Sequence, residues 1–183
     1  MRMPRILRAG ALYHVTARIN RKEMVLDRAA IKELLLGVIK RAKAKYSFRV
    51  DNFSIMGNHI HLIIKPAQTA SLSRIMQWIL GVFAMAYNRL MGLTGHVWGE
   101  RFRSRIVDGL RAFMKVFKYI DGNPVTAGLA SDPKEWRFGG LWHHRTACRD
   151  IVDPVDGSML LLFPEHGQVL IPAIGVATRR RKA

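Results

Sequence analysis

The feature that most restricts the fold is a Gly57-Asn58 turn between two runs of β-forming residues. Residues 48–56 precede the turn, and residues 59–65, HIHLIIK, follow it directly. A short turn of this kind between two such runs predicts an antiparallel hairpin. Alternation along the first run would place Phe48, Val50, Asn52, Ser54 and Met56 on one face and Phe53 and Ile55 on the other. Any fold proposed for the chain has to pair these two strands.

The segments around the hairpin complete a regular order of strands and helices. Apolar residues alternate in the predicted strands and recur every three to four positions in the predicted helices. Asp27 and Ser71 are the expected N-caps of the first two helices, and Asn123-Pro124 is expected to end the third. The order β-α-β-β-α-β predicts an α+β, ferredoxin-like fold: a four-stranded antiparallel sheet with both helices on one face, followed by a third helix. The predicted strands are residues 12–19, 48–56, 59–65 and 97–107, and the predicted helices are residues 27–45, 71–91 and 110–122.

One domain accounts for most of the chain, since 183 residues is an ordinary length for a single domain. The composition changes after Asp150, where prolines and glycines interrupt an apolar run and Arg179-Arg180-Arg181-Lys182 follows. We therefore expect a domain at residues 1–150 and a C-terminal appendage with a basic tail at residues 151–183.

The charge of the chain is strongly positive, with 30 Lys and Arg against 13 Asp and Glu and a net charge of +17. Such a surface attracts polyanions, so the expected partner is nucleic acid or an anionic membrane. No apolar run is long enough to span a membrane, and no secretory signal is evident. The single cysteine, Cys148, excludes an internal disulfide framework and a Cys-rich zinc site. We expect a basic cytoplasmic protein that has no membrane partner.

The triplet His59-Ile60-His61 is the first candidate for chemistry. On a strand the two imidazoles would point to the same side, at a spacing that suits one metal ion, while Ile60 points to the core. Two histidines do not complete a metal site, and the alternative is a pair of polar residues on a solvated sheet face. The triplet by itself leaves both interpretations open.

The second candidate is Tyr119 on the third predicted helix. Tyr119 would lie on the flank of the apolar stripe, with Lys115 one turn before it and Asn123 one turn after it. A phenol, an ammonium and an amide can therefore face a common point. The alternative is a half-buried tyrosine at a helix edge, followed by an asparagine that ends the helix.

Basic residues form the third pattern. Arg101, Arg103 and Arg105 alternate on one side of the last predicted strand, and further cations gather after the first strand and along the tyrosine helix. This concentration favours phosphate contacts over a merely solvated surface. The candidate nucleic-acid-binding residues, assigned to DNA by the resemblance described next, are Arg18, Arg21, Lys22, Arg101, Arg103, Arg105 and Lys115.

Taken together and in order, these segments resemble the REP-associated tyrosine transposases, a subgroup of the single-tyrosine HUH, insertion-sequence-200-like transposases. FSIMGNHIHLIIKP resembles the metal motif of these enzymes, and KYIDGNPVTAGL resembles their tyrosine helix. LYHVTARINRKE, VWGERFRSRIV and DPKEWRFGG resemble further segments of the subgroup. The resemblance covers roughly residues 8–145. The turn after the first strand lacks the Arg-Gly of the subgroup, and residues after Asp150 have no counterpart in it.

The resemblance implies a metal-dependent transesterase that nicks and rejoins single-stranded DNA at hairpin or palindromic elements. Tyr119 would be the nucleophile and form a 5′-phosphotyrosine link, while His59, His61 and Asn123 would hold Mg²⁺ or Mn²⁺. Lys115 or water bound to the ion would accept the phenol proton. His14, on the strand beside the HUH strand, is not assigned to the site.

The implied partner is single-stranded or hairpin DNA, such as a repetitive extragenic palindrome, with no small-molecule cofactor and a monomeric or homodimeric protein. Three alternatives remain. One is a non-catalytic ferredoxin-like nucleic-acid-binding module, and the second is an HUH initiator of replication or mobilisation. The third is a metal-dependent hydrolase that forms no covalent intermediate.

Overall fold

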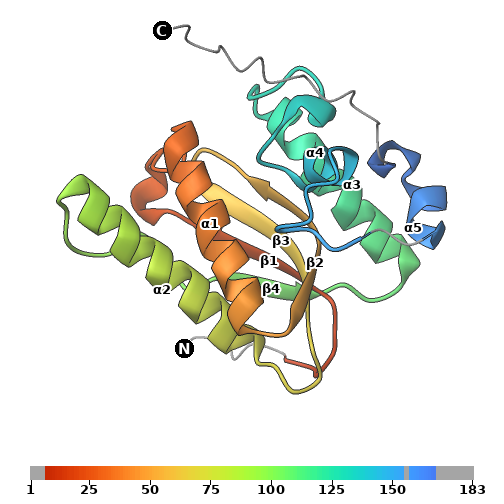
Figure 1. Cartoon of the computed structure of the whole chain (residues 1–183), viewed down its shortest axis with the longest axis horizontal. Coiled ribbons are helices and arrows are strands. Elements are labelled where there is room, and N and C mark those ends of the chain that lie inside the picture. The colour runs from red at the N-terminus through yellow and green to blue at the C-terminus, as the bar shows by residue number, and fades with distance from the viewer. Residues whose placement is uncertain (1–6, 155–156, 168–183) are drawn as a thin grey trace, which may run out of the picture.

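The computed structural model describes residues 7–154 and 157–167, which contain a single four-stranded sheet. The strands are β1 (Tyr13–Arg18), β2 (Phe48–Ile55), β3 (His59–Pro66) and β4 (Arg103–Ile106). All pairings are antiparallel, and the spatial order is β2-β3-β1-β4. Helices α1 (Ala29–Lys45) and α2 (Leu72–Met91) lie side by side over one face of the sheet (Figure 1). The predicted ferredoxin-like fold is confirmed.

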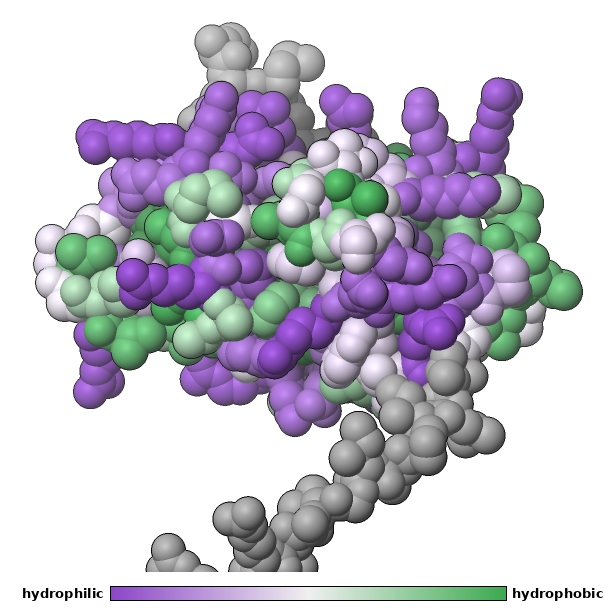
Figure 2. Space-filling view, turned by 90° about the horizontal axis from the view of Figure 1, so that it is seen from above, coloured by the Kyte–Doolittle hydropathy of each residue, from purple (hydrophilic) through white to green (hydrophobic). Residues whose placement is uncertain are grey.

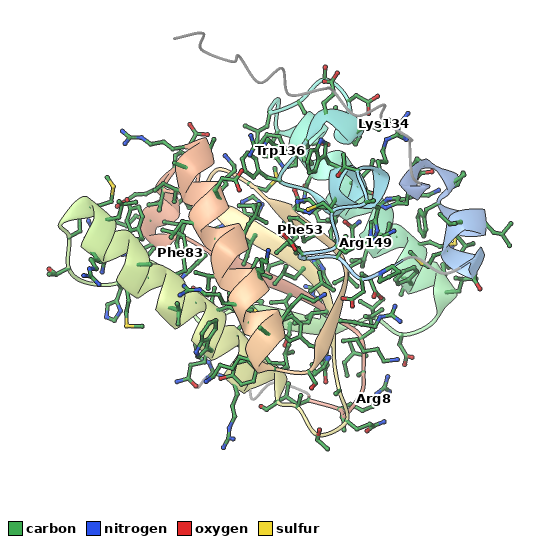
Figure 3. All side chains as sticks on the ribbon, in the orientation of Figure 1. Arg8, Phe53, Phe83, Lys134, Trp136 and Arg149 are labelled. Carbon is green, nitrogen blue, oxygen red and sulfur yellow. The ribbon has the colours of Figure 1, made fainter. Side chains whose placement is uncertain are left out.

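The face of the sheet under α1 and α2 is apolar. Alternate residues of β3 point into this core, and helical spacing brings side chains of both helices against them. Phe53 of β2 and Phe83 of α2 are both fully buried there (Figure 3). Burial of each large apolar side chain contributes about 1.5–3 kcal/mol to folding. The central members of the core are Leu35, Val38, Ile39, Ile60, Leu62, Ile64, Ile75 and Ile79.

The predicted N-cap is confirmed for α2 and wrong for α1. The Ser71 hydroxyl accepts from Arg74 N at 3.4 Å and caps α2, which ends at Gly92 in the left-handed conformation. Arg28 is the N-cap of α1 and makes no side-chain cap, so the prediction of Asp27 is wrong. The Asp27 carbonyl instead accepts from Lys32 Nζ at 2.7 Å.

Strand β2 contains a β-bulge that the alternation did not predict. Between Val50 and Asn52 the pairing with β3 skips Asp51. The extra residue reverses the side to which later side chains point. The predicted grouping of Phe48 and Val50 with Asn52 is therefore wrong, and Asn52 lies on the opposite face, paired with Ile63. The β2 residues in the helix-covered core are Phe48, Val50, Phe53 and Ile55.

Strand β4 is shorter than predicted, because regular pairing with β1 begins only at Arg103. The preceding residues contribute an isolated bridge between Ile19 and Trp98. Arg101 therefore lies ahead of the strand, and the predicted row on one strand holds for Arg103 and Arg105 alone.

Helix α3 (Leu110–Thr126) packs on the face of the sheet opposite α1 and α2. Its buried residues Phe117 and Ile120 cluster with Ile63 of β3. The helix continues through Pro124 to Thr126, so the prediction that it ends at Asn123-Pro124 is wrong. A proline in the last turn removes one hydrogen bond, and it leaves the turns that carry Tyr119 intact.

Later segments cover the outer edge of β2. Val50 N donates to the Asp153 carboxylate at 2.9 Å, and Asp153 N donates back to Val50 O at 3.0 Å. His144 of α4 (Gly140–Arg145) bonds through Nε2 to the carbonyl of the bulge residue Asp51 at 3.0 Å. These bonds satisfy backbone N–H and C=O groups of β2 that an uncovered edge strand would leave unpaired.

The described part of the C-terminal segment packs on the body of the protein. Ile151 and Val152 are buried in the main core. Helix α5 (Gly157–Leu162) and the single turn η3 (Pro164–His166) follow, and Phe163 and His166 are fully buried. The division into residues 1–150 and 151–183 stays a prediction, and the basic tail lies outside the described residues.

Hydrophilic side chains cover most of the face seen in Figure 2. Exposed apolar side chains occur at the C-terminal end of α2, where Met85, Leu90 and Leu93 lie, and on α5 at Leu161. Of the helices in the described ranges, none has the length and apolarity that crossing a lipid bilayer requires.

Candidate active site

A cleft of about 510 Å³ opens on the face of the sheet that carries α3. Its lining comes from β1, the turn η1 (Asn20–Lys22), β3, the start of β4 with the segment before it, and one residue of α3, Tyr119. Segments distant in the sequence thus meet at one point, because β1 is hydrogen-bonded to both β3 and β4.

His59, His61 and Tyr119 lie together in this cleft. The ring centroids of His59 and His61 are 5.0 Å apart, as expected for neighbours on one face of a strand. The Tyr119 ring stands edge-on to His61 with centroids 5.5 Å apart, and Tyr119 is 52% exposed. Its hydroxyl is therefore accessible to a ligand, while the ring sits beside the histidine pair.

His14 joins this group from the neighbouring strand. Its Nε2 lies 2.9 Å from His61 Nδ1, and the two rings are stacked with centroids 5.2 Å apart. His14 also makes an edge contact with Tyr119, at 6.3 Å between centroids. The site is therefore a cluster of three histidines and one tyrosine.

The environment keeps these histidines neutral. Burial lowers the pKa of His61 to about 3, and the repulsion that a proton on His61 would meet from a protonated His59 contributes to this shift. Burial also lowers the pKa of His59 and of His14, with smaller contributions from Arg18 and Arg105 respectively. At neutral pH the rings are uncharged, which is the form in which imidazole binds metal ions.

Each histidine of the pair has one ring nitrogen in a hydrogen bond with the protein. His59 Nδ1 lies 2.8 Å from the Asn58 side-chain oxygen, so this nitrogen carries the proton and donates it. His61 Nδ1 faces His14 Nε2, and His61 Nε2 is buried with no hydrogen-bond partner. His59 therefore presents the lone pair of Nε2. The tautomer of His61 in which Nδ1 donates to His14 Nε2 leaves the His61 Nε2 lone pair free for a cation.

Cationic side chains line the same cleft, namely Arg18, Arg21, Lys22, Arg101 and Arg103. Arg103 is 3.2 Å from the Glu100 carboxylate, and both side chains are exposed, so the pair holds this arginine only weakly. Arg21 and Lys22 have φ of 50° and 60°, a left-handed backbone that non-glycine residues rarely adopt. Five of the seven predicted DNA-binding residues thus share one cleft with the histidines and Tyr119.

Three predicted residues lie outside this lining in the described part of the chain. Arg105 and Lys115 are exposed. Asn123 lies one turn after Tyr119, and its Nδ2 is buried without a partner. The structure therefore brings together Tyr119, His59 and His61, and it does not bring Asn123 or Lys115 into the cleft.

Sequence analysis did not assign His14 to the site. His14 is predicted on a strand, but the register decides what lies beside it. Thr16 pairs with His61 and His14 with Ile63, which sets the His14 ring against His61. No pattern within residues 12–19 specifies that register.

A second group of ligand-type side chains lies on the far side of α3. Atoms of Asp121, Glu165 and His166 fall within 4.8 Å of one another, close enough to hold a cation. His166 Nε2, however, lies 2.9 Å from one Asp121 oxygen, and the other oxygen accepts from Asn52 Nδ2 at 2.9 Å. Protein hydrogen bonds thus already occupy the ligand atoms of Asp121 and His166.

Comparison with known families gives this arrangement its context. The model of the family described as "Transposase IS200 like" matches residues 9–123, which include the histidine pair and Tyr119. The chain belongs to the IS200-like transposases. Membership of this family means DNA cleavage and strand transfer as the general activity, and the matched residues form the strands and the helix that line the cleft.

One solved structure shows the same fold, and a second aligns over part of this chain. A REP-associated tyrosine transposase bound to a REP hairpin is 20% identical and aligns over 93% of this chain and 99% of its own, with a TM-score of 0.67. The alignment extends beyond Asp150, so the expectation that the later residues have no counterpart in the subgroup is wrong. A protein described as a candidate transposase from Deinococcus radiodurans R1 is 13% identical over 67% of this chain and 97% of its own, with a TM-score of 0.48. No curated protein sequence matches this IS200-like transposase.

Proposed function

We propose that this IS200-like transposase is a metal-dependent, single-tyrosine DNA transesterase that nicks and rejoins single-stranded DNA at hairpin or palindromic elements. The observation that carries the proposal is the position of Tyr119. Its accessible phenol stands 5.5 Å from the His61 ring in a cleft lined by five cations. A nucleophile, metal-ligand nitrogens and phosphate-binding groups therefore share one space.

Tyr119 would act as the attacking group. Its Oη forms a bond to phosphorus while the bond from phosphorus to the 3′-oxygen breaks, giving a 5′-phosphotyrosine link and a free 3′-OH. The phosphodiester is exchanged rather than hydrolysed, so a later attack by a 3′-OH can rejoin DNA and release Tyr119. The phenol proton must leave during attack, and Lys115 is poorly placed to take it because Lys115 does not line the cleft.

The residues present fit a divalent ion, Mg²⁺ or Mn²⁺. The unpartnered Nε2 of His61 and the matching nitrogen of His59 would bind it. Asn123, one turn after Tyr119 but outside the cleft lining, stays the proposed third ligand on the strength of the family resemblance. When bound, the ion would polarise the scissile phosphate and offset charge on the leaving 3′-oxygen. Imidazole ligands favour Mn²⁺ over Mg²⁺, because Mg²⁺ prefers oxygen.

The proposed substrate is a hairpin with a single-stranded foot. The cations at the cleft would contact phosphates, and these contacts carry affinity irrespective of sequence. A hairpin is favoured because the similar REP-associated transposase is bound to one. A monomer or a homodimer would serve equally, because the described residues of one chain supply His59, His61 and Tyr119.

Tyr119→Phe tests the proposal. The ring and its contacts remain, so the free energy of unfolding should fall by at most about 1 kcal/mol. The variant should bind a labelled hairpin oligonucleotide as the wild type does, yet form no covalent adduct in the presence of Mn²⁺. Denaturing gels of wild type and variant, with and without Mn²⁺, give the measurement.

Each alternative predicts a different gel. A non-catalytic binding module gives no adduct in the wild type, and a hydrolase without a covalent intermediate cuts in both proteins with the product free. An HUH initiator that uses another tyrosine keeps its adduct in the Phe variant, and Tyr87 is then the residue to replace next.

A further inference from the structure

The structure holds α3 by a chain of polar contacts on the side opposite Tyr119. Asn52 Nδ2, on β2, donates to Asp121 Oδ1 at 2.9 Å, and Asp121 Oδ2 lies 2.9 Å from His166 Nε2. Asn52 and His166 are both fully buried. Asp121 is thus bonded on one side to the sheet and on the other to the C-terminal segment.

Helical geometry relates this chain of contacts to the site. Asp121 is two residues from Tyr119, which corresponds to about 200° around the helix axis. The bonds of Asp121 therefore fix the rotation of α3, and with it the position of the phenol. A rotation of about 20° would move a group at the surface of a helix by roughly 2 Å. Misplacement of a reacting group by about 1 Å can slow a reaction roughly 100-fold.

Aromatic packing reinforces the contact between α3 and the C-terminal segment. Phe163 stacks on Phe117 with centroids 4.3 Å apart, and the His166 ring meets Phe117 at 4.7 Å. Figure 1 shows α5 beside α3, away from α1 and α2. The family match ends at residue 123. Phe163 and His166, which follow it in the sequence, therefore form part of the surface on which the tyrosine helix α3 packs.

The β2 bulge places Asn52 where α3 needs it. With strict alternation from Val50, Asn52 would face the core beneath α1, whereas the skipped Asp51 turns it to the α3 face. There its amide also reaches Phe117 O at 3.5 Å, and its oxygen accepts from Phe53 N at 2.8 Å. Gly140 of α4 closes over it, since a Cβ at that position would stand 2.1 Å from the Asn52 oxygen. Asn52 is therefore fixed on all sides.

We infer that Asn52, Asp121 and His166 are positioning residues for Tyr119, and that the C-terminal segment through His166 belongs to the catalytic apparatus of this chain. The inference rests on the proposed function for its effect on cleavage. Its structural part, that this chain of contacts fixes the location of the tyrosine, stands without that function.

The test compares Asp121→Leu with Asp121→Asn and with a matched control, Asp153→Leu. Leucine is close to aspartate in shape and removes both bonds, whereas asparagine can still accept from Asn52 and donate to His166. Asp153 ties the C-terminal segment to the β2 edge and to Lys43 without touching α3, so it reports a purely structural loss. The measurements are the single-turnover rate of adduct formation with Mn²⁺ and the Kd for the hairpin without metal.

We expect Asp121→Leu to slow adduct formation at least tenfold with a Kd within twofold of wild type. Asp121→Asn should stay within threefold of the wild-type rate, and Asp153→Leu should lower thermal stability while leaving the rate within twofold. An unchanged rate in Asp121→Leu, or a loss that Asp153→Leu matches, overturns the inference. Should Asp121→Leu fail to fold, His166→Leu undergoes the same test; it loses the bond to Asp121 and the ring contact with Phe117 but keeps the bond between Asn52 and Asp121.

A second readout does not depend on activity. The chain has four tyrosines, so 3-fluorotyrosine labelling gives few ¹⁹F signals, and Tyr119→Phe identifies the one from Tyr119. We expect that signal to shift or broaden in Asp121→Leu and to remain unchanged in Asp153→Leu; an unchanged signal in both overturns the inference. If wild type forms no adduct, the proposed function fails while this readout still decides the positioning role.

Discussion

The two faces of the sheet are built in opposite ways. The face under α1 and α2 is continuously apolar, with Leu35, Ile39 and Ile60 completely buried. The other face is divided: one part forms a small apolar seat for α3 around Ile63, and the rest is the cleft with its histidines and cations.

Because of this difference, one face of the sheet mainly stabilises the fold and the other mainly supports the activity. The covered face gains free energy from buried area, to which many side chains contribute and which depends little on any single contact. The open face depends on a few polar contacts with defined partners, such as His14 with His61 and Asn52 with Asp121. Substitutions on the first face should therefore change stability, and those on the second should change activity.

The largest expected effect is on the open face. Replacing His59 and His61 together by Ala should abolish cleavage, because the metal-ligand nitrogens are lost, while hairpin binding stays within a few fold since phosphate contacts supply most affinity. Cleavage and filter-binding assays on the same preparation measure both. Cleavage by the double variant at the wild-type rate would remove these histidines from the proposed site.

A substitution on the face under α1 and α2 should lower stability and leave activity unchanged. Leu35→Ala should lower the free energy of unfolding by about 2–5 kcal/mol, because it leaves a cavity between α1 and the sheet. The rate of adduct formation per folded molecule should not change. Urea unfolding gives the first value and an active-site titration the second. A slowed reaction in fully folded protein would mean that the two faces are coupled.

His14→Ala should have a smaller effect than loss of the histidine pair. Without the His14 contact, His61 loses the partner that orients its ring, and outer partners of metal ligands are typically worth about 10–100-fold in metal affinity or activity. The Mn²⁺ concentration that gives half-maximal cleavage is the measurement. His96→Ala, at an exposed histidine outside the cleft lining, is the control and should match wild type.

The smallest effect distinguishes the arginines. Arg101→Ala combined with Arg103→Ala should lower the log–log salt slope of hairpin binding by roughly 1.4–1.8, since each phosphate contact contributes about 0.7–0.9. Arg105→Ala should leave the slope unchanged, because Arg105 does not line the cleft. If wild type, the double variant and Arg105→Ala all give the same salt slope, then Arg101 and Arg103 make no phosphate contacts.

Local patterns were sufficient to predict the fold and part of the site. The Gly57-Asn58 hairpin and the spacing of apolar residues determine the order of elements, and alternation is enough to place His59 and His61 on one face. The helical period likewise puts Tyr119 on the flank of α3. These features depend only on residues near each other in the sequence.

The rest depends on long-range contacts that a local pattern does not contain. The bulge at Asp51 has no marker such as glycine, and the contacts that accompany it come from later segments, which bond to Asp51 and Asn52. The role of His14 follows from the register between β1 and β3, and the shortening of β4 takes Arg101 off the strand. The helix end was misplaced because Pro124 is tolerated in a final turn.

The two edges of the sheet are protected from other strands by different means. β2 is capped by its own chain, whereas β4 is four residues long and bears Arg103 and Arg105. Short, charged edge strands resist strand addition between molecules, so these arginines also serve colloidal stability. Replacing Arg103 or Arg105 for a binding study is expected to weaken this protection. Sedimentation of such variants at assay concentration is therefore needed before a weaker affinity is assigned to lost phosphate contacts.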